Sequence, residues 1–174
     1  MTNNDVLRRI RYILDLSDSR MIAIFGKADL QVTREQVSAW LKKDDDPAFI
    51  ACPDVQLATF LNGLINDKRG RKDGPQAIPE KKLTNNLIIK KIKIAFDLKA
   101  DDIMAIMDTV NLSISKHELS AFFRKPGHKH YRKCQDQIMR NFLNGLQHKY
   151  RDSIEDTKRE TGPWKSGNKS ADES

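Results

Sequence analysis

The residues of this chain best suited to bind a partner lie in one basic segment of its second half. Residues 124–133 read RKPGHKHYRK, which places lysine, arginine, histidine and a tyrosine close together. Cationic side chains bind phosphates, and an aromatic ring can stack on a base or on a planar side chain. A solvated basic loop would have the same composition, so both interpretations stay open. The candidate binding residues of this segment are Arg124, Lys125, His128, Lys129, His130, Tyr131, Arg132 and Lys133.

Histidine and cysteine spacing near this segment superficially suggests a metal site. His128, His130 and Cys134 form the pattern H-x-H-x3-C, but a zinc site needs three or four ligands in a fixed geometry. A matching segment earlier in the chain keeps only the cysteine, Cys52. We therefore predict a basic loop with titratable imidazoles, and no metal or other cofactor.

Two cysteines are the candidate nucleophiles. Cys52 and Cys134 each precede a predicted helix, and a helix N-terminus can lower the pKa of a thiol. A cysteine in such a place is more commonly a small buried hydrophobe. No histidine and carboxylate accompany the thiol in both segments, and the chain has no G-x-S-x-G, H-E-x-x-H or phosphate-binding glycine loop. We predict that the protein is not an enzyme.

The elements that position these residues are encoded twice in the chain. A shift of 82 positions aligns residues 2–69 with residues 84–151 without a gap. The strongest match is the segment FLNGL, which occurs at 60–64 and again at 142–146. Self-similarity at a fixed offset indicates an internal duplication. The sequence therefore predicts two tandem homologous repeats with these boundaries.

Two stretches lie outside the repeats. Residues 70–83 contain two glycines and two prolines without periodicity, which is typical of a linker. Residues 152–174 are polar, and we predict a mobile tail there.

Periodicity predicts that each repeat is helical. Val6, Leu7 and Ile10 begin a series of apolar residues spaced by three and four, which indicates an amphipathic helix. Residues 33–36 (TREQ) and 115–118 (SKHE) fit the capping box that begins a helix. No stretch alternates apolar and polar residues over the length of a strand. We predict an all-α fold with about four helices in each repeat.

Glycine and asparagine recur inside the last predicted helix of both repeats. Gly63 and Gly145 each cost about 0.5–1 kcal/mol relative to alanine in a helix, so we predict that two helices approach closely there. Asn62 and Asn144 are also poor helix formers. Their amides either bond to backbone at a helix junction or face a cleft between the repeats.

Size explains why two copies would pack together. A single repeat of about 68 residues buries only a small core and is marginally stable. We therefore expect the repeats to bury their apolar faces against each other about a pseudo-twofold axis, with a groove between them.

Charge differs sharply between the two copies. The whole chain has a net charge of +7; the first repeat has none, the linker +2, the second repeat +7 and the tail −2. Two copies of similar shape with such different charges are expected either to meet different partners or to leave the electrostatic binding to one copy.

The second and third predicted helices resemble a helix-turn-helix in outline. In residues 24–43 an apolar helix, a short turn and a capped helix follow one another, and in such motifs the second helix reads the major groove. The turn at 29–32 lacks the usual glycine, and Trp40 with Leu41 leaves little of the helix free. On this interpretation the binding candidates are Arg34 and Lys42 in the first repeat, and Lys116, Ser120 and Arg124 in the second.

The repeat pattern resembles the YehS-like family of bacterial proteins of unknown function. The resemblance covers residues 2–151 and lies in the TNN at 2–4 and 84–86, the Ser-Ala-Trp/Phe segment at 38–40 and 120–122 and, above all, the paired FLNGL segments. Residues 120–134 of the second copy carry much of it. It implies a cytosolic bacterial protein with two copies of one helical domain. It implies no activity, cofactor or site residue.

We predict a cytoplasmic binding protein that meets an anionic partner, most plausibly nucleic acid, through the second repeat. The alternative is a protein–protein adaptor that takes a partner helix at the third-helix surface or in the groove between the repeats. The longest apolar run, Met21 to Phe25, is far shorter than the roughly 20 residues that span a bilayer, so no membrane is expected. The chain begins without a signal-peptide pattern, and two cysteines fit a reducing compartment. The sequence predicts no oligomeric state.

Overall fold

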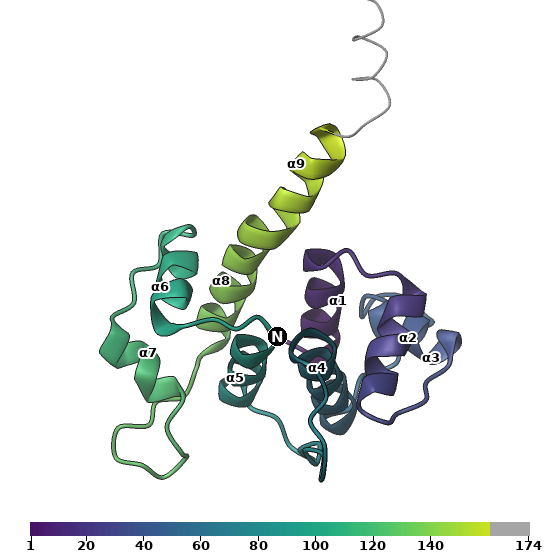
Figure 1. Ribbon diagram of the computed structural model, residues 1–174, viewed down its shortest axis with the longest axis horizontal. Coiled ribbons are helices and arrows are strands. Elements are labelled where there is room, and N and C mark those ends of the chain that lie inside the picture. Colours follow the sequence, from purple (N-terminus) through teal and green to yellow (C-terminus); the bar gives the residue numbers. More distant parts are fainter. Residues whose placement is uncertain (161–174) are drawn as a thin grey trace, which may run out of the picture.

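Helices joined by loops make up the described structure, residues 1–160 of a computed structural model (Figure 1). The first repeat contains α1 (Asn3–Ile13), α2 (Asp18–Lys27), α3 (Arg34–Leu41) and α4 (Asp54–Arg69). The second contains α5 (Asn85–Ala95), α6 (Ala100–Asp108), α7 (Lys116–Phe122) and α8 (Asp136–Leu146), and continues through the π-helical segment η1 (Gln147–Arg151) into α9 (Asp152–Glu160). No strand occurs within residues 1–160. The prediction of an all-α fold built from two four-helix units is confirmed.

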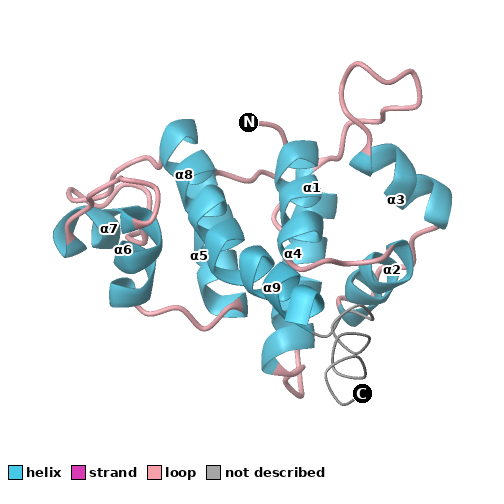
Figure 2. Cartoon of the chain, turned by 90° about the horizontal axis from the view of Figure 1, so that it is seen from above, coloured by secondary structure: helices cyan, strands magenta, loops and turns pink. Residues whose placement is uncertain are grey.

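Four helices form the centre of the molecule. Figures 1 and 2 show α1, α4, α5 and α8 in the middle, with α2 and α3 on one side and α6 and α7 on the other. At the junction of the repeats α4 packs against α5, and α1 packs against α8. The buried apolar residues of both repeats form one cluster, in which Phe25, Phe60 and Phe142 are fully buried. The repeats therefore share a core larger than either holds alone.

The helix starts that the sequence predicts are present. The Thr33 hydroxyl accepts a hydrogen bond from the Gln36 backbone N–H at 3.1 Å, and the Gln36 side chain accepts one from the Thr33 backbone N–H at 2.9 Å. The Ser115 hydroxyl likewise accepts from the Glu118 backbone N–H at 3.0 Å. These bonds satisfy backbone donors that would otherwise be unpaired at a helix start.

A buried asparagine holds the long loop before the last helix in each repeat. The Asn4 amide nitrogen donates to the carbonyls of Trp40 at 3.0 Å and Ile50 at 2.9 Å, and its oxygen accepts from the Cys52 backbone N–H at 3.0 Å. Asn86 makes the same three bonds in the second repeat. The repeated TNN segment therefore serves the fold: its first residue caps the helix and its last fixes the loop.

Glycine allows the second and fourth helices of each repeat to touch. A Cβ atom on Gly63 would lie 2.0 Å from the Ile24 carbonyl oxygen, and one on Gly145 would lie 2.5 Å from the Ile106 carbonyl oxygen. Neither oxygen can move without distorting its helix. The predicted packing role of both glycines is confirmed.

Each repeat donates one hydrogen bond from a cation to an asparagine of the other. The Lys91 ammonium on α5 donates to Asn62 Oδ1 on α4 at 2.6 Å, and the Arg9 guanidinium on α1 donates to Asn144 Oδ1 on α8. The two bonds are exchanged by the 82-residue shift, as a pseudo-twofold axis requires. Of the two alternatives for the asparagines, facing the other repeat is the observed one; their partners are side chains, not backbone.

The helix starts at the junction repeat this exchange. The Leu83 backbone N–H donates to the Asp54 carboxylate, the first residue of α4, at 2.8 Å. The Met1 nitrogen donates to the Asp136 carboxylate, the first residue of α8, at 2.9 Å. The entry to the first helix of each repeat is therefore held by the last helix of the other.

The far ends of the same helices are joined by a third reciprocal pair. Arg69 at the end of α4 lies 3.2 Å from Asp97, and Arg151 lies 3.0 Å from Asp15. Asp15 and Asp97 both have a φ of 53°, a left-handed conformation that ends the preceding helix. Three kinds of contact thus obey one pseudo-twofold relation.

The segment after the second repeat differs from the sequence expectation. Residues 152–160 form α9, whereas we predicted a mobile tail from residue 152; the remainder of that tail, 161–174, lies outside the described residues. Lys158 on α9 donates to Asp15 at 2.7 Å, beside the bond from Arg151. Gly70 ends α4 in the first repeat. Asp152 stands at the matching position of the second repeat, and there the chain continues as a helix.

The linker, residues 70–83, runs along the first repeat. Arg71 forms a two-pronged ion pair with Asp29, with both N–O distances 2.8 Å. Farther along, Glu80 lies 3.0 Å from the Lys91 ammonium. Two charged residues of the linker, Arg71 and Glu80, therefore hold it against both repeats.

Replacing Gly63 by alanine should lower the free energy of unfolding by about 1–3 kcal/mol, the usual cost of forcing extra volume into a packed site. The new methyl group would collide with the Ile24 carbonyl. Urea unfolding followed by circular dichroism measures the change.

Gly26 provides the matched control, because a Cβ there would meet nothing within 4 Å. Gly26→Ala should leave stability unchanged or raise it by at most about 1 kcal/mol. Equal stability of the two variants would contradict the close helix contact.

Candidate nucleic-acid interface

A shallow hollow of about 370 Å³ lies on the outer face of the second repeat. Its cations come from three places: the end of α5, the start of α7 and the loop after α7. The floor is apolar, and the Lys93 ammonium lies 5.7 Å from the centre of the Phe123 ring. The lining residues are Lys93, Ala100, Lys116, Leu119, Ser120, Phe123 and Arg124. We call these residues the α7 face.

The first repeat has a hollow of about 330 Å³ at the corresponding place, along α3. Its lining includes Arg34, Lys42 and the carboxylate of Glu35. Arg34 lies 3.8 Å from the Asp18 carboxylate and donates to the Ser19 hydroxyl at 3.1 Å. The positive charge of this face is therefore partly neutralised by its own helices.

One substitution between the repeats changes the electrostatics of this face. In the first repeat Arg11 and Arg34 share the Asp18 carboxylate, at 3.9 and 3.8 Å. Lys93 and Lys116 stand at the matching positions of the second repeat, but the carboxylate is replaced by the methyl group of Ala100. Among described residues, the only carboxylate that pairs with Lys116 is that of the exposed Asp101, at 4.0 Å. The α7 face thus keeps the cations of the first repeat and loses their shared counter-ion.

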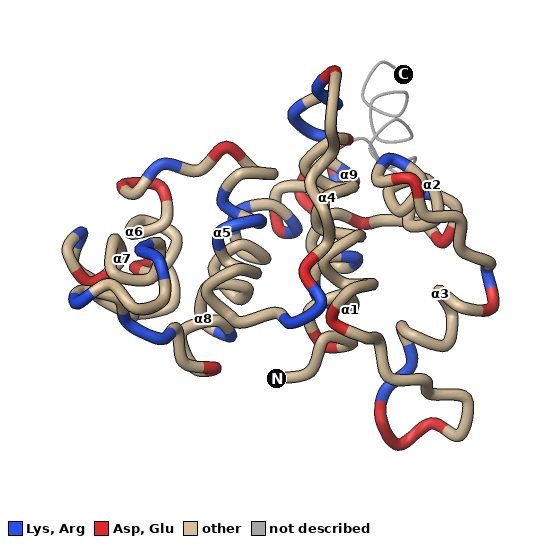
Figure 3. Tube along the Cα trace, turned by 90° about the horizontal axis from the view of Figure 1, so that it is seen from below, with Lys and Arg blue, Asp and Glu red and all other residues tan. Residues whose placement is uncertain are grey.

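The basic loop extends the cationic surface beyond α7. Its backbone turns back on itself, with the Arg132 N–H donating to the Ala121 carbonyl at 3.2 Å and Gly127 in the left-handed region at φ 91°. Figure 3 shows lysine and arginine along this loop, whereas the matching loop after α3 carries an acidic run at residues 44–46. No described ion pair involves the loop cations. The exposed candidates are Arg124, Lys125, His128, Lys129, His130, Arg132 and Lys133, and Tyr131 is half-buried.

The three histidines of this region lie near one another without forming a metal site. The ring centres of His128 and His130 are 5.5 Å apart, and those of His117 and His130 are 6.3 Å apart. The His130 backbone N–H donates to His128 Nδ1 at 3.0 Å. Cys134 is buried, and within residues 1–160 no three His, Cys, Asp or Glu side chains form a group that could hold a metal ion. The H-x-H-x3-C pattern does not assemble.

In the turn between α2 and α3, a short polar residue adopts the left-handed conformation for which a glycine is usual. Asp29 has a φ of 65°, and Asn111 at the matching place has a φ of 60°. Short polar side chains tolerate this left-handed conformation better than others. The predicted burial of Trp40 is observed, at 5% exposure, so only the Arg34 side of α3 faces outwards.

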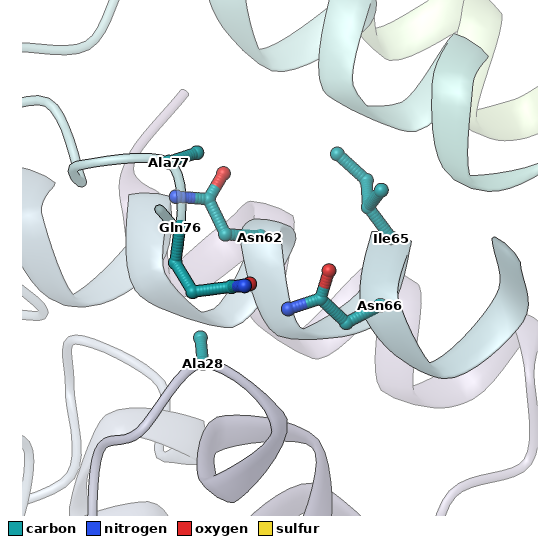
Figure 4. A pocket seen from close by; sticks show the side chains of 6 residues that line it. All are labelled: Ala28, Asn62, Ile65, Asn66, Gln76 and Ala77. Atoms are coloured by element: carbon teal, nitrogen blue, oxygen red, sulfur yellow. The ribbon is translucent and has the colours of Figure 1, made fainter. Parts of the chain in front are cut away.

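A separate, smaller hollow lies beneath the linker (Figure 4). Its volume is about 70 Å³, and carboxamides from α4 and the linker point into it: Asn62, Asn66 and Gln76. Gln76 donates to linker carbonyls at 2.8 and 3.1 Å, and Asn66 donates to the Lys27 carbonyl at 2.9 Å. No charged residue lines this hollow, and the bonds of Gln76 and Asn66 hold the linker and the end of α2 in place.

Sequence reasoning missed Lys93 and Ala100. Lys93 lies near the end of α5, and only the fold brings it beside α7. Ala100 could have been noticed in the alignment of the two copies, where it stands at the position of Asp18. The absence of a carboxylate forms no recognisable sequence motif. Its significance becomes clear only when the structure shows which cations share the Asp18 carboxylate in the first repeat.

Both cysteine thiols are protected by burial. Burial, and secondly the charge of Asp54, raises the pKa of Cys52 to about 12; burial and Asp136 do the same for Cys134. A raised pKa reduces the thiolate, the form that reacts. The interpretation of these residues as small buried hydrophobes fits the structure, and the nucleophile alternative does not.

Thiol labelling should reflect this burial. At pH 8 a disulfide reagent is expected to modify the folded protein at least about 100-fold more slowly than the chain unfolded in guanidinium, because the thiolate fraction is so much smaller. Absorbance of the released thiol group measures both rates. Similar rates in the two states would show that the thiols are accessible.

Comparison with known proteins gives a family but no activity. A family model described as a protein of unknown function, DUF1456, matches residues 3–70 and again 85–152. The uncharacterized protein YehS of Escherichia coli strain K12 is 44% identical over 147 residues, which cover 84% of this chain and 94% of that protein. No solved structure matches the chain. None of the helices in residues 1–160 has the length and apolar character needed to cross a membrane. With both repeats matched and a relative of this identity, the chain belongs to the DUF1456 family of proteins of unknown function.

Proposed function

We propose that this protein is a non-enzymatic, cytoplasmic binding protein whose second repeat contacts nucleic acid through the α7 face and the basic loop. The observation that carries the proposal is the replacement of Asp18 by Ala100 between two faces that keep cations at matching positions. Because Ala100 has no carboxylate, Lys93 and Lys116 cannot form the ion pairs that Arg11 and Arg34 form with Asp18. Without the shared carboxylate, and with only the exposed Asp101 at 4.0 Å from Lys116, their positive charge favours an external anion.

The arrangement suits a phosphate backbone. Lys116 and Arg124 border one hollow, and the loop carries further exposed cations beside it. Cations spread over a helix face and an adjoining loop can contact several successive phosphates, so they suit a nucleic-acid backbone better than a single small anion. The apolar floor at Phe123 offers a surface for a sugar or a base.

The packing of α6 and α7 fits the helix-turn-helix interpretation. α7 follows a connection of seven residues, 109–115, longer than the about three or four usual in this motif. It presents Lys116 and Ser120 outwards while Leu119 and Phe122 are buried. On this proposal α7 lies against the nucleic acid, and the loop contacts the neighbouring backbone. The first repeat, with a net charge of zero, supports the second through the shared core.

A protein partner is the competing function. The hollow along α3 contains Ala39 and Ala48 beside both signs of charge, and Ile50 nearby in sequence is 58% exposed. An adaptor would bind a helix there. Such a complex would survive nuclease and moderate salt.

Replacing Lys129, Arg132 and Lys133 together by alanine should weaken nucleic-acid binding at least about 10-fold. It should also make the salt dependence shallower, because each phosphate contact on duplex DNA contributes a log–log slope of about −0.9. Fluorescence anisotropy with labelled duplex and single-stranded oligonucleotides, at two or more salt concentrations, measures both quantities. The paired variant Arg34→Ala with Lys42→Ala in the first repeat is the control and should bind nearly as well as the natural protein. No binding at low salt, or an unchanged affinity of the triple variant, favours the adaptor.

Ala100→Asp tests the proposal without removing any cation. It restores the carboxylate that the first repeat has, and should weaken binding about 5-fold, since a surface ion pair is worth roughly 1 kcal/mol or less. Ala100→Asn has nearly the same shape without the charge and serves as the control. Equal affinities for the two variants in the same anisotropy titration would remove the α7 face from the interface.

A further inference from the structure

A second group of cations lies far from the α7 face, at the seam between α1 and α8. A hollow of about 220 Å³ opens there, lined by Met1, Asp5, Arg8, Arg9 and Arg140. Three guanidinium groups from two repeats thus border one small space. The seam hollow, as we call it, has no role in the proposed nucleic-acid interface.

Arg9 is the unusual member of this group. Its guanidinium donates to the neutral Asn144 oxygen, and its buried Nε has no hydrogen-bond partner. No carboxylate within residues 1–160 lies within 4 Å of it. Burial lowers the pKa of Arg9. A partly buried cation without a counter-ion is costly unless something else neutralises it.

The other repeat contains an internal comparison for Arg9. Lys91 stands at the matching position and makes the matching bond to Asn62. It also has a carboxylate partner, because Glu80 of the linker lies 3.0 Å from its ammonium. At the contact between the repeats, the charge of Lys91 is therefore neutralised by Glu80. Arg9, at the matching position, has no counter-ion among the described residues.

The remaining charges around the seam hollow are already paired, except for one. Arg8 forms an ion pair with Asp5, and the Asp136 carboxylate accepts from the Met1 nitrogen and from Asn85. Arg140 is exposed, and its charge contributes to lowering the pKa of Asp136, but it forms no ion pair within 4 Å among the described residues. Two guanidinium groups, Arg9 and Arg140, thus remain without a directly bonded carboxylate.

We propose that the seam hollow binds the phosphoryl group of a small phosphorylated ligand between Arg9 and Arg140. The planar fork of a guanidinium matches phosphate oxygens and forms strong charge-assisted hydrogen bonds with them. The small volume, about 220 Å³, admits a compact anion and does not accommodate an extended polyanion. The bound phosphate supplies to Arg9 the negative charge that Glu80 supplies to Lys91, and so stabilises the contact between the repeats.

The test uses the full chain, with inorganic phosphate and adenosine monophosphate as probes. At constant ionic strength, each phosphate probe should raise the melting temperature of the natural protein above its value in chloride. Titration calorimetry should show one site. Tighter binding of the monophosphate identifies a phosphate ester as the ligand, whereas equal or weaker binding identifies free phosphate; both results support the site.

Arg140→Ala should lower phosphate affinity at least about 5-fold, the loss expected for one charge-assisted contact. This variant removes an exposed side chain and leaves the fold intact. Arg9→Gln should abolish the phosphate-dependent rise in melting temperature. Lys91→Gln is the matched control at the other seam position and should retain the rise, as should Lys125→Ala on the basic loop.

Three outcomes would overturn the inference. The natural protein could melt at the same temperature in phosphate and in chloride. Arg140→Ala could bind phosphate as tightly as the natural protein. Loss of binding in Lys125→Ala, but not in Arg140→Ala, would place the phosphate on the basic loop, in keeping with the proposed function but not with a seam site.

Discussion

The arrangement of this protein depends on a polar exchange across the seam between its repeats. Lys91 of the second repeat bonds to Asn62 of the first, and Arg9 of the first bonds to Asn144 of the second. Partly buried polar groups are costly when unpaired, so they permit only packings in which each meets its partner. The apolar faces alone would tolerate a shift of one helix along another. The exchange selects one register, and the pairs at both ends of the same helices agree with it.

This constraint separates the helices that must match from those that are free to differ. α1, α4, α5 and α8 face each other, whereas α2, α3, α6 and α7 face outwards (Figures 1 and 2). Differences in charge accumulate on the outer elements, as at Asp18 and Ala100. The outer face of one repeat can therefore acquire a binding surface while the other repeat maintains the core. The two sides of the seam also differ, because Lys91 has a carboxylate beside it and Arg9 does not.

Local patterns predicted the helices, and the duplication predicted their arrangement. Hydrophobic spacing, the capping residues at Thr33 and Ser115, and the helical glycines each depend on neighbours close in sequence or on an identical copy. The role of Asn4 was not predictable, because its three partners lie more than 35 positions away. The helix at 152–160 was missed for a related reason: its polar sequence has no apolar face, and its contacts to Asp15 come from the other repeat. Of the candidate site, the sequence contains the cations; which of them lack a counter-ion depends on the fold.

Scanning calorimetry tests most directly whether the two repeats form one structural unit. If they share a core and a polar seam, the protein unfolds in a single transition whose calorimetric enthalpy equals its van't Hoff enthalpy. Two transitions, or a calorimetric enthalpy about twice the van't Hoff value, would show that the repeats fold independently. That result would contradict the account given for the seam.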